Sequence, residues 1–204
     1  MARALRGAFG IPAVGARMAD VMGTLKTEPA RGRLDLLAAP VAEALNNWSA
    51  DASVDVDDVL VAPIDATLAD TAAFCATYEV GLDVSANCVV VAGKRGGEIR
   101  YAACVVLATT RADVNNVVRR HLDVRKASFA PMAEAVELTG MEYGGITPIG
   151  LPQQWPILVD PRVAETPYVI IGSGVRHSKI ALPGPALAAL PNAQVVEGLA
   201  RPVA

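Results

Sequence analysis

The fold follows from residues 87–109, which read NCVVVAGKRGGEIRYAACVVLAT. Two runs rich in β-branched residues, Asn87 to Ala92 and Glu98 to Thr109, are joined by Gly-Lys-Arg-Gly-Gly. Because β-branched residues suit strands and glycine suits tight turns, this stretch predicts an antiparallel β-hairpin. We therefore expect hairpin-linked strands at the centre of the fold.

Short helices and further strands are predicted on both sides of the hairpin. Their positions follow from apolar periodicity, capping residues and glycine or proline breaks. The predicted helices are 34–48, 67–78, 113–122, 131–139 and 183–190, and the predicted strands are 59–62, 127–130, 157–159, 168–171, 179–182 and 194–196. This order predicts an α+β fold: a single domain with a curled mixed, largely antiparallel β-sheet or barrel surrounded by short helices.

Three segments are expected along the chain. Residues 1–32 mix Gly, Pro, Arg and Ala without a steady period, and we expect them to be a mobile N-terminal segment. Residues 33–62 are expected to form an N-terminal helix and strand appendage, and residues 63–204 the main domain. The internal methionines Met18 and Met22 suggest, as a hypothesis, a start site downstream of Met1.

The composition favours a folded protein without a membrane span. The chain has 204 residues, 52% of them hydrophobic, which is enough to bury a sizeable core. Its apolar runs are shorter than the about 20 residues that cross a bilayer, so we expect a cytoplasmic protein. Cys75, Cys88 and Cys104 have no metal-like spacing and are expected to be small buried hydrophobes. No residue pattern predicts a metal or another cofactor.

The net charge of −3 argues against binding of nucleic acid by bulk electrostatics. A contact with RNA would have to be local. The main candidates are Arg119, Arg120 and Lys126, and the wider set adds His121, Arg125, Lys94, Arg95, Arg176, His177 and Lys179. Solvated surface charge, balanced by acidic residues such as Asp113, Asp123 and Glu98, is an equally good interpretation of the charge alone.

The stretch Gly144-Gly145-Ile146-Thr147-Pro148-Ile149-Gly150 is the strongest candidate for a binding loop. Glycine permits close backbone approach and positive φ, whereas proline fixes its own φ and removes a donor. Such a loop can present its backbone to a small polar ligand, and we expect it to lie outside the core. The simpler interpretation is an ordinary structural turn.

The order of motifs around this loop resembles the YbaK/ProX family. The segment from Lys126 to Gly140 precedes the loop, a short hydrophobic strand from Pro156 to Asp160 follows it, and Val169 to Arg176 contains a Gly-Ser-Gly turn. These are small aminoacyl-tRNA editing proteins, related to the editing domain of bacterial prolyl-tRNA synthetases. The resemblance runs from about Ile64 to about Glu197. It implies the fold, deacylation of mischarged tRNA, the aminoacyl-tRNA 3′ end as partner, and an aminoacyl-tRNA synthetase as a further candidate partner.

The resemblance also implies a pocket built from backbone rather than from a catalytic triad. The aminoacyl pocket would be lined by Gly144, Gly145, Ile146, Thr147 and Pro148. Gly172, Ser173 and Gly174 would turn amides toward the ester, and His177 would lie near the substrate. Editing deacylation uses water as nucleophile, so amides at the developing oxyanion can replace a titrating side chain. In the family, a ribose hydroxyl of the substrate is thought to position the water.

Asn87 departs from the family pattern. The resemblance implies a lysine, associated with deacylation, early in the strand that here reads Ser85-Ala86-Asn87-Cys88-Val89-Val90-Val91. An amide cannot replace an ammonium electrostatically, so Asn87 itself, Lys94 or Arg100 would have to supply the missing contact. Three interpretations follow, in this order: a trans-editing deacylase of altered or reduced activity, a binding module that has lost the reaction, and an unrelated protein in which the glycines only turn the chain.

Overall fold

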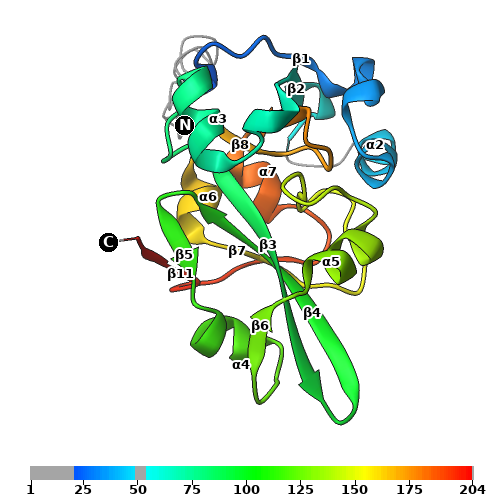
Figure 1. The fold of residues 1–204 in the computed structure, drawn as a ribbon, viewed down its shortest axis with the longest axis vertical. Coiled ribbons are helices and arrows are strands. Elements are labelled where there is room, and N and C mark those ends of the chain that lie inside the picture. The colour runs from blue at the N-terminus through cyan, green and yellow to red at the C-terminus, as the bar shows by residue number, and fades with distance from the viewer. Residues whose placement is uncertain (1–20, 49–53, 204) are drawn as a thin grey trace, which may run out of the picture.

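The computed structural model describes residues 21–48 and 54–203, whose strands form three sheets (Figure 1). The largest has the order β10-β7-β4-β3-β6, the second β1-β2-β9-β8, and the third pairs β11 with β5. Most strand pairs are antiparallel, whereas β4–β7 and β7–β10 are parallel. The predicted α+β class with a curled, mixed and largely antiparallel sheet is therefore confirmed.

The predicted hairpin consists of β3 (Ala86–Arg95) and β4 (Glu98–Leu107), and it turns at Gly96 and Gly97, which have φ angles of +60° and +94°. Strand β4 begins at Glu98 as predicted, whereas β3 continues past Ala92 to Arg95. Gly93 lies in this extension and has no room for a side chain, because an added Cβ would lie 2.8 Å from the carbonyl oxygen of Lys126. Without a side chain there, β6 (Ala127–Phe129) can pair with β3 along this stretch.

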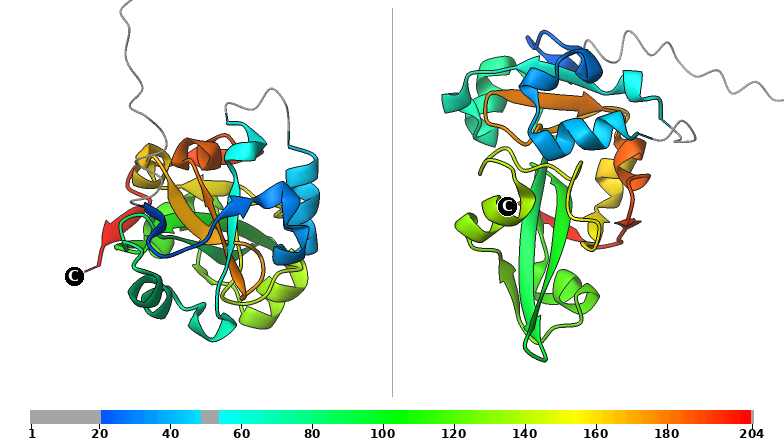
Figure 2. Two further views of the ribbon diagram at one scale, coloured as in Figure 1. Left: turned by 90° about the horizontal axis from the view of Figure 1, so that it is seen from above. Right: turned by 90° about the vertical axis from the view of Figure 1, so that its right-hand side faces the viewer.

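The second sheet covers the other end of the hairpin. It contains β1 (Glu28–Pro29), β2 (Leu60–Pro63), β8 (Val169–Gly172) and β9 (Ser178–Leu182). A parallel bridge from Ser85 to Ile170 joins it to the start of β3. The four-stranded sheet and the hairpin tip thus occupy opposite ends of the long axis (Figure 1; Figure 2, right).

The helices are short, as predicted, but two begin later than their apolar patterns suggest. Helix α2 spans Ala39–Asn46 rather than 34–48, because Pro40 is accommodated only in the first turn of a helix. Helix α3 spans Thr71–Tyr78 and is capped by Asp70, whose carboxylate accepts from the Ala72 amide at 3.1 Å. Asp65 caps a separate 3-10 turn, Ala66–Leu68.

The other predicted helices lie close to their expected positions. Asp113 caps a π-helical turn, Val114–Val118, that continues into α4 (Arg119–His121). Helix α5 (Met132–Thr139) ends at Gly140, whose φ is +65°. Helix α7 spans Gly184–Ala188, and the remaining predicted strands are β7 (Ile157–Val159) and β10 (Ala193–Val195).

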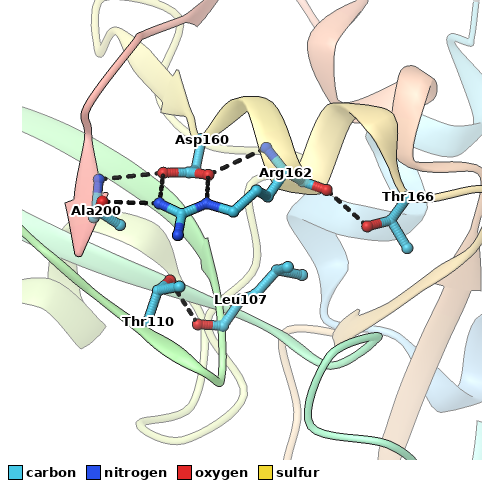
Figure 3. Close-up of polar contacts among 6 residues, drawn as sticks. All are labelled: Leu107, Thr110, Asp160, Arg162, Thr166 and Ala200. Atoms are coloured by element: carbon cyan, nitrogen blue, oxygen red, sulfur yellow. Dashed lines mark hydrogen bonds and ion pairs between the residues drawn. The ribbon is translucent and has the colours of Figure 1, made fainter. Parts of the chain in front are cut away.

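One helix and three strands, β1 among them, were missing from the sequence predictions, and Asp160 connects the helix with the other two strands (Figure 3). This carboxylate is 1% exposed; it caps α6 (Pro161–Glu165) and accepts from the amide of Ala200 at 3.1 Å. The Arg162 guanidinium donates to both Asp160 oxygens, at 2.8 and 3.0 Å, and to the Ala200 carbonyl at 2.7 Å. These bonds tie β11 (Ala200–Pro202), which pairs with β5 (Thr110–Ala112), to the start of α6.

The N-terminal expectations fall partly outside the described residues. Residues 1–20, including Met18, are not described. Met22 is 5% exposed, and Ala30, which follows β1, is fully buried in the core with the start of α2. Within the ranges 21–48 and 54–203, no helix has the length and hydropathy of a membrane span.

Candidate functional site

The two glycine motifs lie against each other. The Gly174 amide donates to the Gly145 carbonyl at 2.7 Å, and the Glu142 amide donates to the Gly174 carbonyl at 2.8 Å. An added Cβ at Gly145 would be 2.5 Å from the carbonyl oxygen of Val175, and one at Gly172 would be 2.3 Å from the carbonyl oxygen of Gly145. The glycines are therefore needed because two backbone segments, residues 144–147 and 172–175, pack directly together.

The loop is less exposed than the sequence suggests. Thr147 is 0% and Ile149 1% exposed, and Pro148 is also buried, so the expectation that the loop lies outside the core is wrong. Gly144, with a φ of +87°, is exposed, and Ile146 and Gly150 are half-buried, so parts of the loop still have accessible surface. The Thr147 hydroxyl is buried and has no hydrogen-bond partner among the described residues.

Ser173 stabilises the Gly-Ser-Gly turn through a buried hydroxyl. Its side chain is 0% exposed, and its hydroxyl lies 2.7 Å from that of Ser178, which in turn bonds to the carbonyl of Leu36. A hydroxyl so enclosed cannot reach a substrate ester. The Gly174 amide is likewise already used within the turn.

Asn87 lies at the junction of the two large sheets. Its Oδ1 accepts a hydrogen bond of 2.8 Å from the hydroxyl of Thr71, the first residue of α3. Asn87 and Gly172 each lie two residues beyond the bridge between Ser85 and Ile170. The Asn87 side chain therefore contacts the start of α3, and the bridge brings the start of β3 beside the strand that leads into the second glycine motif.

Two basic side chains, one at the end of the second glycine motif and one on β9, also reach the segment before α3. Arg176 donates to the carbonyls of Ala66 at 3.0 Å and Tyr143 at 3.2 Å. The Lys179 ammonium donates to the carbonyl of Ala69 at 3.2 Å and lies 5.1 Å from the centre of the Phe74 ring. His177, between them, is exposed, and its backbone carbonyl accepts from the Ile64 amide.

These contacts define the candidate site, which we call the α3 junction. Its members come from the start of α3, the start of β3, the glycine loops and β9: Thr71, Asn87, Gly144, Ile146, Gly172, Arg176 and Lys179. Sequence reasoning found the glycines and Asn87, but it treated Arg176 and Lys179 only as candidates for RNA contact. Thr71 was missed, because a helix-starting threonine carries no functional signal by itself.

Lys94 and Arg100 cannot supply charge to Asn87. Asn87 pairs with Val106, whereas Lys94 lies seven residues further along β3 and Arg100 pairs with Gly93. At about 3.3 Å per residue, Lys94 is about 23 Å from Asn87 along the strand. Arg100 instead donates to the carbonyl of Leu122 at 3.0 Å. The expectation that either residue replaces the missing lysine is wrong.

The residues expected to meet tRNA lie at the hairpin tip, away from the α3 junction (Figure 1). Arg120 and Lys126 are exposed, whereas Arg119 is half-buried and donates to the carbonyl of Asn115 at 2.8 Å. We call the surface formed by Arg119, Arg120 and Lys126 the basic end. Its role in tRNA binding stays a prediction.

The described residues give little support for a metal site or a cysteine nucleophile. Within residues 21–48 and 54–203, no cluster of three or more His, Cys, Asp or Glu could hold a metal ion. Burial raises the pKa of the Cys104 thiol to about 12 and also raises the pKa of Cys75, so both are protonated at neutral pH and are poor nucleophiles. A cavity of about 770 Å³ lies beside Pro148, Trp48 and Trp155, and none of the α3-junction residues lines it.

Comparisons of structure agree on the fold. A candidate trans-editing enzyme for prolyl-tRNA synthetase superposes with a TM-score of 0.65 at 21% identity, covering 78% of this chain and 94% of that one. A scaffold protein used for epitope grafting gives 0.65 at 20% identity, covering 78% and 95%. The hypothetical protein APE2540 gives 0.60 at 21% identity, covering 69% and 90%.

Comparisons of sequence identify the family. No curated protein matches this chain. The model of the aminoacyl-tRNA editing domain matches residues 65–190, which include every member of the α3 junction. This match rules out the interpretation of an unrelated protein in which the glycines only turn the chain. The chain belongs to the aminoacyl-tRNA editing domain family.

Proposed function

We propose that this protein is a trans-editing deacylase that hydrolyses the ester of mischarged tRNA. The observation that carries the proposal is the α3 junction: two interlocked glycine loops beside a neutral amide and two basic side chains, within a domain of the editing family. Water attacks the ester carbonyl, the bond to the ribose oxygen breaks, and the products are a free amino acid and tRNA with its 3′-terminal hydroxyl restored.

We infer different tasks for the parts of the site. Gly144 and Ile146 form the wall against which the aminoacyl group packs. The Thr71 hydroxyl occupies Oδ1 of Asn87, which leaves the two N–H groups of Nδ2 to donate to a carbonyl or ribose oxygen. Gly172 has no side chain, so the backbone of Gly145 and Ile146 can pack against it, and this packing holds the wall in place.

A panel of mischarged tRNAs, including alanyl- and cysteinyl-tRNA, tests this function under single-turnover conditions. We expect loss of the ester from at least one member of the panel at a rate above the uncatalysed reaction. Asn87→Ala should slow that reaction, because the substrate carbonyl loses its amide donor. If no ester is hydrolysed while a non-hydrolysable amide analogue of aminoacyl-adenosine binds, the protein is a binding module for the tRNA 3′ end.

Asn87 bears on the rate as well as on binding. Hydrogen bonds from charged donors are about twice as strong as those from neutral ones. If no other group replaces the charge, the protein should be slower than lysine-bearing members of the family on a shared substrate, and Asn87→Lys should raise its rate.

A further inference from the structure

Lys179 places an ammonium group inside the α3 junction. Lys179 pairs with Gly172 on the neighbouring strand, so its side chain lies on the face of the sheet where a Gly172 side chain would be. The backbone of residues 145–146 packs on this same face. Its Nζ reaches the carbonyl of Ala69, two residues before the Thr71 that bonds to Asn87. Lys179 and Asn87 thus approach the start of α3 from two different strands.

The Lys179 ammonium is only partly satisfied by the protein. An ammonium has three N–H donors, and the described structure gives Lys179 one acceptor, at 3.2 Å. Among the ion pairs of residues 21–48 and 54–203, none includes Lys179. The charged or titratable groups around it are Arg176, Cys75 and Asp70. This half-buried cation has the Ala69 carbonyl and the Phe74 ring beside it but forms no ion pair with a carboxylate, so the negative charge of a ligand would offset the cost of its burial.

Arg176 is less suited to this task. Its guanidinium already donates to the carbonyls of Ala66 and Tyr143, and its backbone amide donates to the carboxylate of Glu142 at 2.6 Å. Through these bonds Arg176 connects the loop of residues 142–144 with the segment before α3. Lys179 has N–H donors left over, so it is the cation of the junction that can bind a ligand.

We propose that Lys179 donates to the oxyanion that develops on the ester carbonyl during deacylation, and so supplies from β9 the positive charge that Asn87 lacks on β3. The proposal rests on the deacylase function above and assigns the charge stabilisation in that reaction to one side chain. Asn87 then orients the carbonyl, and Lys179 binds it more strongly as negative charge accumulates.

Lys179→Met tests the proposal, because methionine keeps an unbranched apolar chain over Phe74 and removes the charge together with the bond to the Ala69 carbonyl. We expect the single-turnover rate constant to fall by about 10²-fold, the size of effect seen when one oxyanion donor is removed, with little change in substrate affinity. Lys26→Met, a matched change at an exposed lysine of the N-terminal segment, should leave the rate unchanged. Lys179→Gln serves as a second variant if methionine prevents folding, and thermal unfolding of each variant reports on the fold.

The double variant Lys179→Met with Asn87→Lys distinguishes an electrostatic role of Lys179 from a structural one. It returns an ammonium to the junction from the other strand, so it should recover most of the lost rate, which a purely structural role of Lys179 would not allow. Asn87→Lys alone should gain little, because the charge is already present and a second ammonium is repelled.

Each outcome distinguishes the two proposals. A parent that hydrolyses no mischarged tRNA overturns the deacylase function and the role of Lys179 together. An active parent with an equally active Lys179→Met variant overturns only the role of Lys179. A large acceleration by Asn87→Lys alone also overturns it, because the junction would then lack a cation.

Discussion

Gly145 lies where the backbone of Val175 leaves no space for a side chain, since an added Cβ would be 2.5 Å from its carbonyl oxygen. We expect Gly145→Ala to lower the free energy of unfolding by about 1–3 kcal/mol, as in other overpacked sites, and to weaken substrate binding as the loops separate. Chemical denaturation and single-turnover deacylation check the two effects. Gly32→Ala is the control, because nothing lies within 4 Å of its added Cβ. Equal stability of the two variants would contradict the tight packing of the loops.

Ser173 offers a second test at the residue scale. Ser173→Ala removes the buried hydroxyl that bonds to Ser178, so we expect a loss of about 1–3 kcal/mol in the free energy of unfolding. The deacylation rate per folded molecule should be unchanged, because the hydroxyl does not reach the substrate. Ser128→Ala, on the exposed part of β6, is the stability control. Complete loss of activity in a folded Ser173→Ala protein would instead point to a nucleophile.

The pH dependence follows from the environment of Lys179. Burial lowers the pKa of this ammonium in the folded protein below its unfolded value. As pH rises through the lowered pKa, the folded protein loses the proton first, so its stability increases while the catalytic charge disappears. We expect the deacylation rate, corrected for uncatalysed hydrolysis, to fall over that range in the parent and not in Lys179→Met. Parallel profiles would contradict this assignment.

At the scale of elements, Asp160 stabilises α6 and β11 together. Asp160→Ala removes the cap of α6, the acceptor of the Ala200 amide and the partner of Arg162, and we expect the free energy of unfolding to fall by about 2–4 kcal/mol. Asp65→Ala is the comparison, because Asp65 caps only an exposed turn and its loss should cost about 1 kcal/mol. Urea unfolding measures both. Equal losses would mean that the bonds to β11 contribute nothing.

The elements that could be predicted are those whose signal is local. The hairpin and helices α3 and α5 follow from β-branched runs, apolar periodicity and capping residues. Strands β5 and β11 are three residues long and pair across a large sequence separation, so no local pattern marks them. Helix α6 does carry a signal, an aspartate followed by proline, which also fits a simple turn.

The candidate site was predictable to a similar extent. The glycine motifs mark close backbone approach, and the structure does bring Gly145 and Gly172 together. The sequence could not show that Thr71, Asn87 and Lys179 converge, because they come from three elements joined only by the meeting of two sheets. It also could not show that Lys94 is distant, since that depends on how far the hairpin extends.

At the scale of the whole molecule, the basic end should contribute salt-dependent tRNA binding. Arg120 and Lys126 are exposed there, so replacing both by Ala should weaken tRNA binding and reduce the slope of log affinity against log salt by about one for each lost phosphate contact. Lys26→Ala with Arg31→Ala is the matched control, because these exposed residues belong to the N-terminal segment beside the four-stranded sheet. Binding titrations at several salt concentrations measure the slope. An unchanged slope would mean that Arg120 and Lys126 are solvated surface charges that do not contact phosphates.

The hairpin separates the α3 junction from the basic end by a fixed length. From Asn87 to Arg95, β3 pairs continuously with β4, and at about 3.3 Å per residue this stretch spans about 25 Å. A tRNA that binds at both places would therefore be selected by a distance. The distance from its aminoacylated terminus to the phosphates that meet the basic end would have to equal the length of this stretch of the hairpin. Discrimination of this kind depends on the geometry of the acceptor arm and is indifferent to its nucleotide sequence.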